Sequence, residues 1–472
     1  TQGVSSAASD VYKRQIIYIS ILQMISGRRA GMSVSIIRKP IYGSLLEYNK
    51  LCSGEPYISI PGIYAKAPAR LDVDNDIMSK HILMSGGTGS GKTNAIYHIL
   101  SQLKKRLTPD DILIVFDTKG DYYGKFGKSD DLVIGNSVEY RDKSEKWNLY
   151  REILADGWNW QEIENNVQEI SWSIFKESID KSKDPFFPNA ARDLFAGMLM
   201  CLMETGKTKQ DFKRRNYYNS VLKKSLDSAT IMHIKAMVEA HPRYASVASY
   251  IGDGKNNQSL GVYAEMLSNL RKILVGVFAD TGSFSIRNFV RQRGGKTLFI
   301  EYDLALGNTL SPIYSLLIDL ALKETLGRSE HKGNVYMFFD EFRLLPYLQH
   351  IDDAVNFGRS LGLKIVAGIQ SVNQMTELYG EYRGKNILAG FSSVFAFRAN
   401  DADTRKFITD LYGENVVMEQ RKSLSNVMTE EQKNAHVVED WDMRDLNIGE
   451  AIVGFPFREP FKFQFDEYRK VR

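Results

Sequence analysis

One glycine-rich loop restricts the fold of this chain more than any other feature. It lies in the segment HILMSGGTGSGKTNAI, residues 81–96, between a short apolar run and a longer segment of helical character. The loop fits the pattern G-x-x-x-x-G-K-[ST], in which a strand, a loop and a helix surround phosphate oxygens with backbone N–H groups. The sequence therefore predicts a phosphate-binding loop made of Gly86, Gly87, Thr88, Gly89, Ser90, Gly91, Lys92 and Thr93.

The last two residues of this loop carry its chemistry. In such loops the lysine, here Lys92, contacts the β- and γ-phosphates of a nucleotide. The hydroxyl group of Thr93 is expected to join the ligands of Mg²⁺. We therefore expect ATP and Mg²⁺ as cofactors.

Two adjacent carboxylates follow a second apolar run. The residues Val335–Phe339 have the pattern of a buried strand, and they end in Asp340 and Glu341. Burying such charges is unfavourable by several kcal/mol unless a cation lies nearby, and a magnesium-bound nucleotide supplies one. We expect Asp340 to bind the magnesium ion and Glu341 to orient and polarise the attacking water. The alternative is an acidic pair stabilised by the dipole of a following helix.

Short apolar runs alternate with helical-length segments from Ile82 onward, which predicts an α/β fold with a mostly parallel sheet covered on both faces. The expected strands are residues 81–85, 111–117, 296–303, 335–340, 363–369 and 393–399. About 180 residues without comparable strands separate the second run from the third, and their apolar residues recur at helical spacing. We predict an inserted all-α domain at 160–272, between the two parts of a nucleotide-binding domain at 30–159 and 273–472.

The first 29 residues stand apart from this plan. Residues 1–15 have no pattern typical of a structural element, and we expect a non-native leader there. The apolar run 16–26 is shorter than the ~18–20 residues that span a bilayer, yet the basic flank of a cytoplasmic membrane exit follows it at Gly27-Arg28-Arg29. Residues 16–29 are therefore either the stub of a transmembrane span or a short buried or interfacial segment.

Composition excludes some classes and leaves nucleic acid to a local argument. The chain has 61 basic and 57 acidic residues, a net charge of +4, which does not by itself indicate a nucleic-acid partner. The 2 cysteines form no C-x-x-C motif, which argues against a disulfide scaffold or a thiolate metal site.

One segment is strongly basic. Residues 207–224, KTKQDFKRRNYYNSVLKK, interleave lysines and arginines with aromatic residues and contain a single acid. Phosphate neutralisation combined with base stacking is typical of single-strand binding, whereas a solvated helix face is the alternative. The candidates for DNA contacts are Lys213, Arg214, Arg215 and Tyr217.

Four segments together resemble the type IV secretion coupling proteins of the TraD/TraG/TrwB kind. They are GGTGSGKT, FDTKGDYYGKFG (116–127), the stretch 340–380 that begins with DEFRLLPYLQ, and FRANDADTRKFITDLYG (397–413). The resemblance covers most of residues 78–460. It implies a RecA-like P-loop ATPase with an all-helical insertion, which forms a homo-hexamer anchored in the bacterial inner membrane with the bulk of the chain in the cytoplasm.

The same resemblance implies two more site residues. Arg359 matches an arginine that reaches the nucleotide of a neighbouring subunit, and Gln370 matches a polar residue that senses the γ-phosphate. A solvated helical arginine and an amide that caps a turn are the alternatives. The turn FDTKGD lies near the nucleotide edge, without an assigned role.

The implied function is that of an ATP-hydrolysing motor that delivers single-stranded DNA, with its relaxase, to a type IV secretion channel. The implied partners are single-stranded DNA, relaxase and relaxosome proteins, and that channel. Two alternatives remain open at this point. One is a related motor, either a HerA/FtsK-like DNA translocase or a VirB-type secretion ATPase. The other is a substrate-docking receptor in which nucleotide only stabilises the ring.

Overall fold

The computed structural model describes residues 44–51, 56–327, 333–422 and 428–469. The leader expected at 1–15 and the membrane stub expected at 16–29 lie outside the described residues, so both remain predictions. Within the described part of the chain, no helix combines the length and the apolar character that crossing a bilayer requires.

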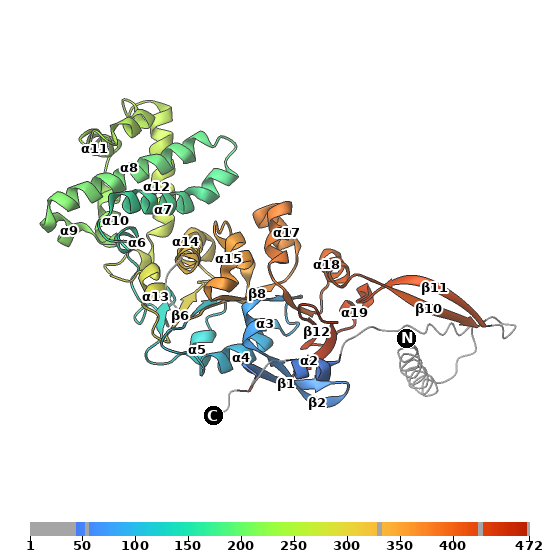
Figure 1. Cartoon of the computed structure of the whole chain (residues 1–472). Coiled ribbons are helices and arrows are strands. Elements are labelled where there is room, and N and C mark those ends of the chain that lie inside the picture. Colours follow the sequence, from blue (N-terminus) through green and yellow to red (C-terminus); the bar gives the residue numbers. More distant parts are fainter. Residues whose placement is uncertain (1–43, 52–55, 328–332, 423–427, 470–472) are drawn as a thin grey trace.

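A large twisted sheet forms the centre of the molecule (Figure 1). Its described part has 11 strands in the order β2-β1-β13-β12-β9-β3-β8-β7-β4-β6-β5. From β9 to β5 all neighbouring strands are parallel. These strands are β9 (Ser393–Phe397), β3 (Ile82–Ser85), β8 (Leu363–Ile369), β7 (Val335–Phe339), β4 (Ile112–Asp117), β6 (Thr297–Glu301) and β5 (Leu132–Ile134). All six predicted strands belong to this parallel region, and they are buried on both faces.

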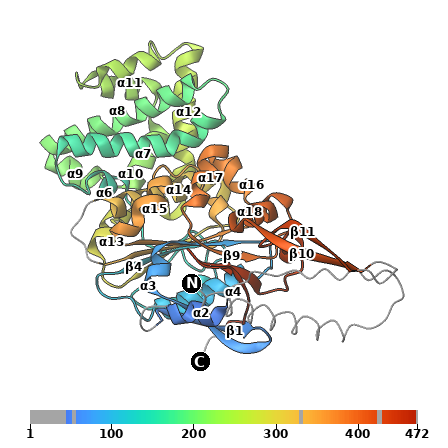
Figure 2. The ribbon, with the colours of Figure 1, turned by 45° about the vertical axis from the view of Figure 1, so that its right-hand side comes forward.

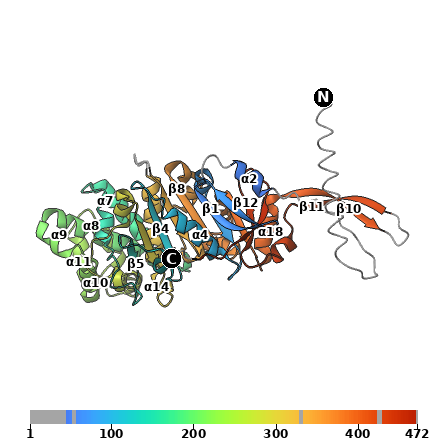
Figure 3. The same ribbon diagram turned by 90° about the horizontal axis from the view of Figure 1, so that it is seen from below.

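Four further strands extend the sheet in antiparallel fashion beyond β9. They are β12 (Glu450–Gly454), β13 (Phe461–Phe465), β1 (Ile58–Tyr64) and β2 (Ala67–Val73). In β13 buried and half-buried residues alternate, as expected for a strand with one covered face. A separate hairpin of β10 (Glu414–Lys422) and β11 (Met428–His436) projects from the body (Figures 1 and 3).

Each face of the sheet has its own hydrophobic cluster, because successive side chains of a strand point to opposite faces. Along β7, Tyr336 and Phe338 belong to the cluster that packs on helix α4 (Lys92–Leu103), whereas Met337 and Phe339 belong to the other. The α4 face is covered by α2 (Leu45–Leu51), α3 (Asn75–Ser79), α4 and α5 (Tyr122–Phe126). The opposite cluster includes residues of α6 (Leu149–Ile153), α13 (Ile286–Gln292), α14 (Gly307–Leu326), α15 (Ile351–Phe357), α16 (Asn373–Tyr379), α17 (Glu381–Ala389), α18 (Ala402–Tyr412) and α19 (Asp440–Arg444).

A group of helices between β5 and β6 forms a helical part beyond this second face (Figures 1 and 2). Its members are α7 (Trp160–Lys181), α8 (Phe186–Thr208), α9 (Gln210–Asn216), α10 (Asn219–Ser228), α11 (Ile231–Glu239) and α12 (Asn257–Ile273). The predicted α/β class with an all-helical insertion is confirmed. One hydrophobic cluster runs from the sheet into these helices, so the limits 30–159, 160–272 and 273–472 stay predictions.

A buried network of ion pairs joins the helical part to the sheet. Arg287 of α13, which is 4% exposed, contacts Asp156 at 2.8 Å and Glu324 of α14 at 3.0 Å. Arg291 pairs with the same two carboxylates. Because Asp156 lies in the segment that connects α6 to α7, this network fixes the connection to the helical part against α13 and α14.

We expect Arg287→Ala to lower the free energy of unfolding by about 1.5–3 kcal/mol, because the change removes the buried charged partner of Asp156 and Glu324 and leaves these half-buried carboxylates to Arg291 alone. Urea unfolding followed by near-UV circular dichroism measures the effect. The matched control is Arg271→Ala, since Arg271 lies 3.9 Å from Asp227 and is 65% exposed. The control should change stability by less than about 1 kcal/mol, and equal effects of both changes would contradict a structural role for the buried network.

Candidate functional site

The glycine-rich loop begins at the carboxyl end of β3, in the interior of the sheet, and ends at the first turn of α4. Gly91, the N-cap of α4, has φ 115°, a conformation that L-residues with a side chain rarely adopt. A Cβ atom there would lie 2.7 Å from the Cα atom of Gly449. The loop therefore requires glycine at position 91 for both its conformation and its space.

Lys92 lies inside this loop. Its ammonium group donates hydrogen bonds to the carbonyl oxygens of Gly86, at 2.5 Å, and Gly87, at 3.1 Å. The side chain is 7% exposed, and burial lowers the pKa of Lys92 below its usual value. The loop thus encloses a cation where a phosphate chain is expected to bind.

Thr93 meets the first acid of the predicted pair. Its hydroxyl group donates to the carboxylate of Asp340, with distances of 3.0 and 3.2 Å to the two oxygens. Asp340, which is 5% exposed, follows β7, and β8 separates β7 from β3 in the sheet. The two residues predicted to bind magnesium are therefore in contact, and a hydroxyl with a carboxylate is the oxygen donor set that Mg²⁺ prefers.

Glu341 meets the predicted sensor residue. The amide nitrogen of Gln370, directly after β8, donates to the Glu341 carboxylate at 2.5 Å. The amide oxygen of Gln370 in turn accepts from the hydroxyl of Thr88 in the loop, at 3.3 Å. Burial raises the pKa of Glu341. A continuous hydrogen-bonded path therefore joins the loop to the second acid through Gln370.

Sequence reasoning gave no role to Lys119, which lies in the same cluster. Its ammonium group donates to Thr93 Oγ1 at 2.7 Å and lies 3.3 Å from the Asp340 carboxylate. The turn that carries it forms because Asp117 accepts hydrogen bonds from the backbone N–H groups of Lys119 and Gly120. Burial raises the pKa of Asp117 to about 6. The sequence contained one signal for a role of Lys119. This lysine of FDTKGD lies two residues after the end of a predicted parallel strand, at the edge of the sheet where the loop also lies.

Arg359 lies away from this cluster. It belongs to the short 3₁₀ helix Gly358–Leu361 before the start of β8, whereas Gln370 follows the end of that strand. Its guanidinium group pairs with Asp76 at 2.6 Å, and the side chain is 52% exposed. The structure does not bring Arg359 to the loop of its own chain, and a role at the nucleotide of a neighbouring subunit stays a prediction.

The DNA candidates lie in the helical part. Lys213, Arg214 and Arg215 lie on α9, which contributes no buried residue. The ring of Tyr217 is 7% exposed and already stacks on Tyr150 with centroids 4.6 Å apart, so most of its surface is covered, and its contact with DNA stays a prediction. Its hydroxyl group donates to the carbonyl oxygen of Leu202.

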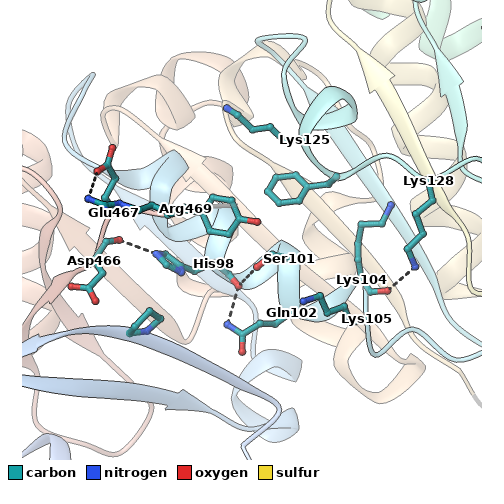
Figure 4. A pocket seen from close by; sticks show the side chains of 13 residues that line it. His98, Ser101, Gln102, Lys104, Lys105, Lys125, Lys128, Asp466, Glu467 and Arg469 are labelled. Carbon is teal, nitrogen blue, oxygen red and sulfur yellow. Dashed lines mark hydrogen bonds and ion pairs between the residues drawn. The ribbon is translucent and has the colours of Figure 1, made fainter. Parts of the chain in front are cut away.

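A cavity of about 730 Å³ lies between α4, the segment around the end of α5 and the segment after β13, and no residue of the glycine-rich loop lines it (Figure 4). Several lysines line it, but Lys104 pairs with Asp131 and Lys125 with Asp121. Figure 4 also shows His98 directed at the backbone carbonyl of Asp466, 2.8 Å away. The segment after β13 is thus fastened to α4, and much of the positive charge in this cavity is neutralised.

The parallel sheet, the loop and the acidic pair define a RecA-like P-loop protein with a helical insertion. A family model described as the type IV secretion-system coupling protein DNA-binding domain matches residues 66–457. The chain belongs to this family of coupling proteins.

Individual relatives agree with this assignment. Coupling protein TraD of Escherichia coli strain K12 is 22% identical over 352 residues, which cover 73% of this chain and 45% of TraD. Conjugal transfer protein TraG of Agrobacterium fabrum is 25% identical over 243 residues, which cover 50% of this chain and 36% of TraG. The chain thus spans less than half the length of these relatives.

Solved structures of plasmid coupling protein TrwB share the fold. The unbound monoclinic form of TrwBdeltaN70 has a TM-score of 0.72 at 22% identity, and the match covers 93% of this chain and 96% of that solved chain. The complex of TrwB with ADP and Mg²⁺ has a TM-score of 0.70, also at 22% identity, and the match covers 94% of this chain and 98% of that solved chain.

Proposed function

We propose that this chain is an ATP-hydrolysing motor that delivers single-stranded DNA, with its relaxase, to a type IV secretion channel. Membership of the coupling protein family supports the class. The observation that carries the ATPase assignment is the contact of Thr93 with Asp340, beside the path from Thr88 through Gln370 to Glu341. Two hydroxyl groups of the loop therefore contact one amide and one carboxylate, and the amide contacts a second carboxylate.

The residues have distinct roles in this proposal. Thr93 and Asp340 would hold Mg²⁺, and the bound ion would neutralise charge on the phosphate oxygens. Lys92 leaves the carbonyl oxygens of Gly86 and Gly87 to contact the β- and γ-phosphates.

Glu341 accepts a proton from the attacking water. A general base works best when its pKa lies near the operating pH, and burial raises the pKa of Glu341 in that direction. Gln370 keeps Glu341 oriented and links it to the loop.

The wider assignment follows the family. We infer a homo-hexamer at the bacterial inner membrane, with the bulk of the chain in the cytoplasm and relaxosome proteins as partners. The family match favours a coupling protein over a HerA/FtsK-like translocase or a VirB-type ATPase. A docking receptor that binds nucleotide without turning it over is the remaining alternative, and a turnover measurement separates it from the motor.

The first prediction from this proposal concerns the turnover of ATP. Single-stranded DNA should stimulate ATP hydrolysis by the wild-type chain. Glu341→Gln should lower the rate by about 10²–10⁴-fold, because an amide cannot accept the proton, yet should retain ATP binding. Lys92→Ala should lose both binding and hydrolysis. Phosphate release and ATP-binding assays measure the two properties, and unchanged hydrolysis in either variant would remove the motor assignment.

The second prediction concerns Lys119, whose ammonium group and a magnesium ion cannot occupy the same position between Thr93 and Asp340. We expect Lys119→Met to strengthen the magnesium-dependent part of ADP binding by about two- to five-fold, the size of one half-exposed ion pair. The measured quantity is the ratio of ADP dissociation constants in EDTA and in Mg²⁺. Lys128→Met, on the same segment but away from Asp340, is the control. Equal weakening in both buffers would instead mean that Lys119 binds phosphate.

The third prediction concerns Arg359. If it acts at a neighbouring subunit, Arg359→Ala should reduce turnover by about 10³–10⁵-fold without weakening ATP binding. Asp76→Asn removes only the intrachain partner of Arg359 and should leave turnover nearly unchanged. Rings mixed from Arg359→Ala and Glu341→Gln subunits should regain activity where an intact Arg359 faces an intact Glu341. Equal losses in the Arg359 and Asp76 variants would assign the arginine a structural role.

A further inference from the structure

A second cavity, of about 750 Å³, lies where the helical part joins the sheet. One wall comes from α6, the segment that follows it and Asn288 of α13, and the other comes from α9 and the two residues between α9 and α10. Figures 1 and 2 both show α6, α9 and α10 side by side at this junction. The volume falls within the range of about 300–1,000 Å³ that is typical of small-ligand sites.

The charge of this cavity is uncompensated. Arg151, Lys213 and Arg214 line it, and none of the described residues that line it is acidic. Among the described residues, no carboxylate forms an ion pair with Arg151 or Lys213, whereas Arg214 lies 4.0 Å from Asp211 in a highly exposed pair. The lysine-lined cavity behind α4 differs, because acids there neutralise Lys104 and Lys125. The junction cavity is therefore suited to an anion.

Aromatic rings accompany these cations. Trp158 is half-buried, and the ammonium group of Lys213 lies 4.6 Å from its ring centroid. Tyr218, also half-buried, lines the same cavity, and the stacked pair of Tyr150 and Tyr217 forms a buried wall. A ring face beside unpaired cations is the combination that binds a base together with its phosphate.

We propose that the junction cavity holds one nucleotide of a nucleic-acid single strand, with the base against Trp158 and the phosphate between Arg151 and Lys213. The proposal deepens the proposed function and rests on it for the identity of the strand. It also changes the roles within the basic segment, because Lys213 and Arg214 line the cavity whereas Arg215, on the same helix, does not. Tyr217 contributes to the wall and does not stack on the base.

The experiment compares two charge-matched double variants of the full chain. Arg151→Ala with Lys213→Ala removes two cavity cations, whereas Arg215→Ala with Lys224→Ala removes two exposed cations outside the cavity. Fluorescence anisotropy measures the affinity for labelled oligo-dT from low to high salt. Because each phosphate contact contributes about 0.7 to the single-strand salt slope, and both cations contact one phosphate, the cavity variant should lose about 0.7, and the control variant much less.

A stacking variant tests the base. Trp158→Leu keeps an apolar side chain and should weaken oligo-dT binding by about five-fold or more. Thermal melting of each variant without DNA verifies folding, and Trp158→Phe, which keeps a ring, should restore most of the affinity. Competition with dTMP distinguishes a strand from a free nucleotide: displacement of oligo-dT only at large excess supports the strand, and displacement at equal concentration overturns it.

The outcomes separate this proposal from the motor assignment. If cavity and control variants lose affinity equally, binding is diffuse and the cavity proposal fails, whatever the ATPase result. If Trp158→Leu binds DNA as the wild type does, the stacking role fails in the same way. If the cavity variants lose affinity selectively while the wild type hydrolyses no ATP, the cavity stands and the motor assignment fails.

Discussion

The contact between Thr93 and Asp340 joins parts of the chain that are 247 residues apart in the sequence. The whole helical part lies between them along the chain. The contact forms only because β3 and β7 are parallel and point their carboxyl ends to the same edge of the sheet, with β8 between them. In open α/β sheets this edge is where ligands bind. The sheet order thus determines the site more directly than any single loop does.

Strand burial explains how much of the fold the sequence revealed. β7 and β8 are buried at every residue, and fully buried strands appear in the sequence as continuous apolar runs. β1 was missed because Pro61 and Gly62 interrupt its alternating pattern, which then resembles a loop. β13 alternates without interruption but has only five residues. β5 is only three residues long, too short for a periodic signal. Tertiary pairing, not local sequence, defines these strands.

The site residues likewise divide into those that the sequence placed together and those that only the structure revealed. Lys92, Thr93 and Asp340 could be placed together because each follows a recognisable strand or loop. Lys119 meets the same criterion but sits in a turn whose shape depends on hydrogen bonds to the buried Asp117. The burial of Tyr217 could not be read from the sequence for a different reason. A tyrosine among lysines looks exposed in sequence, and only the stacking of its ring on Tyr150 of α6 shows that it is buried.

At the junction between the sheet and the helical part, hydrogen bonds to one buried carboxylate hold α6 in place. Glu152 of α6 is fully buried and accepts hydrogen bonds from Trp147 Nε1, Ser285 Oγ and the backbone N–H of Ile286. A buried carboxylate without such donors is strongly unfavourable, so these bonds fix α6 to the segment that begins α13. The cavity wall that carries Arg151 is therefore continuous with the sheet.

The opposite wall belongs to the helical part through α9. A ligand that bridges Arg151 and Lys213 contacts both parts at once, and it stabilises the arrangement in which the two walls are closest. The ion pairs of Arg287 and Arg291 hold Asp156, in the segment after α6, against α13 and α14, so they fix the wall opposite α9. The wall that carries Arg151 is also connected to the central sheet, because α13 leads directly into β6, and β6 pairs with β4, the strand after which Lys119 lies.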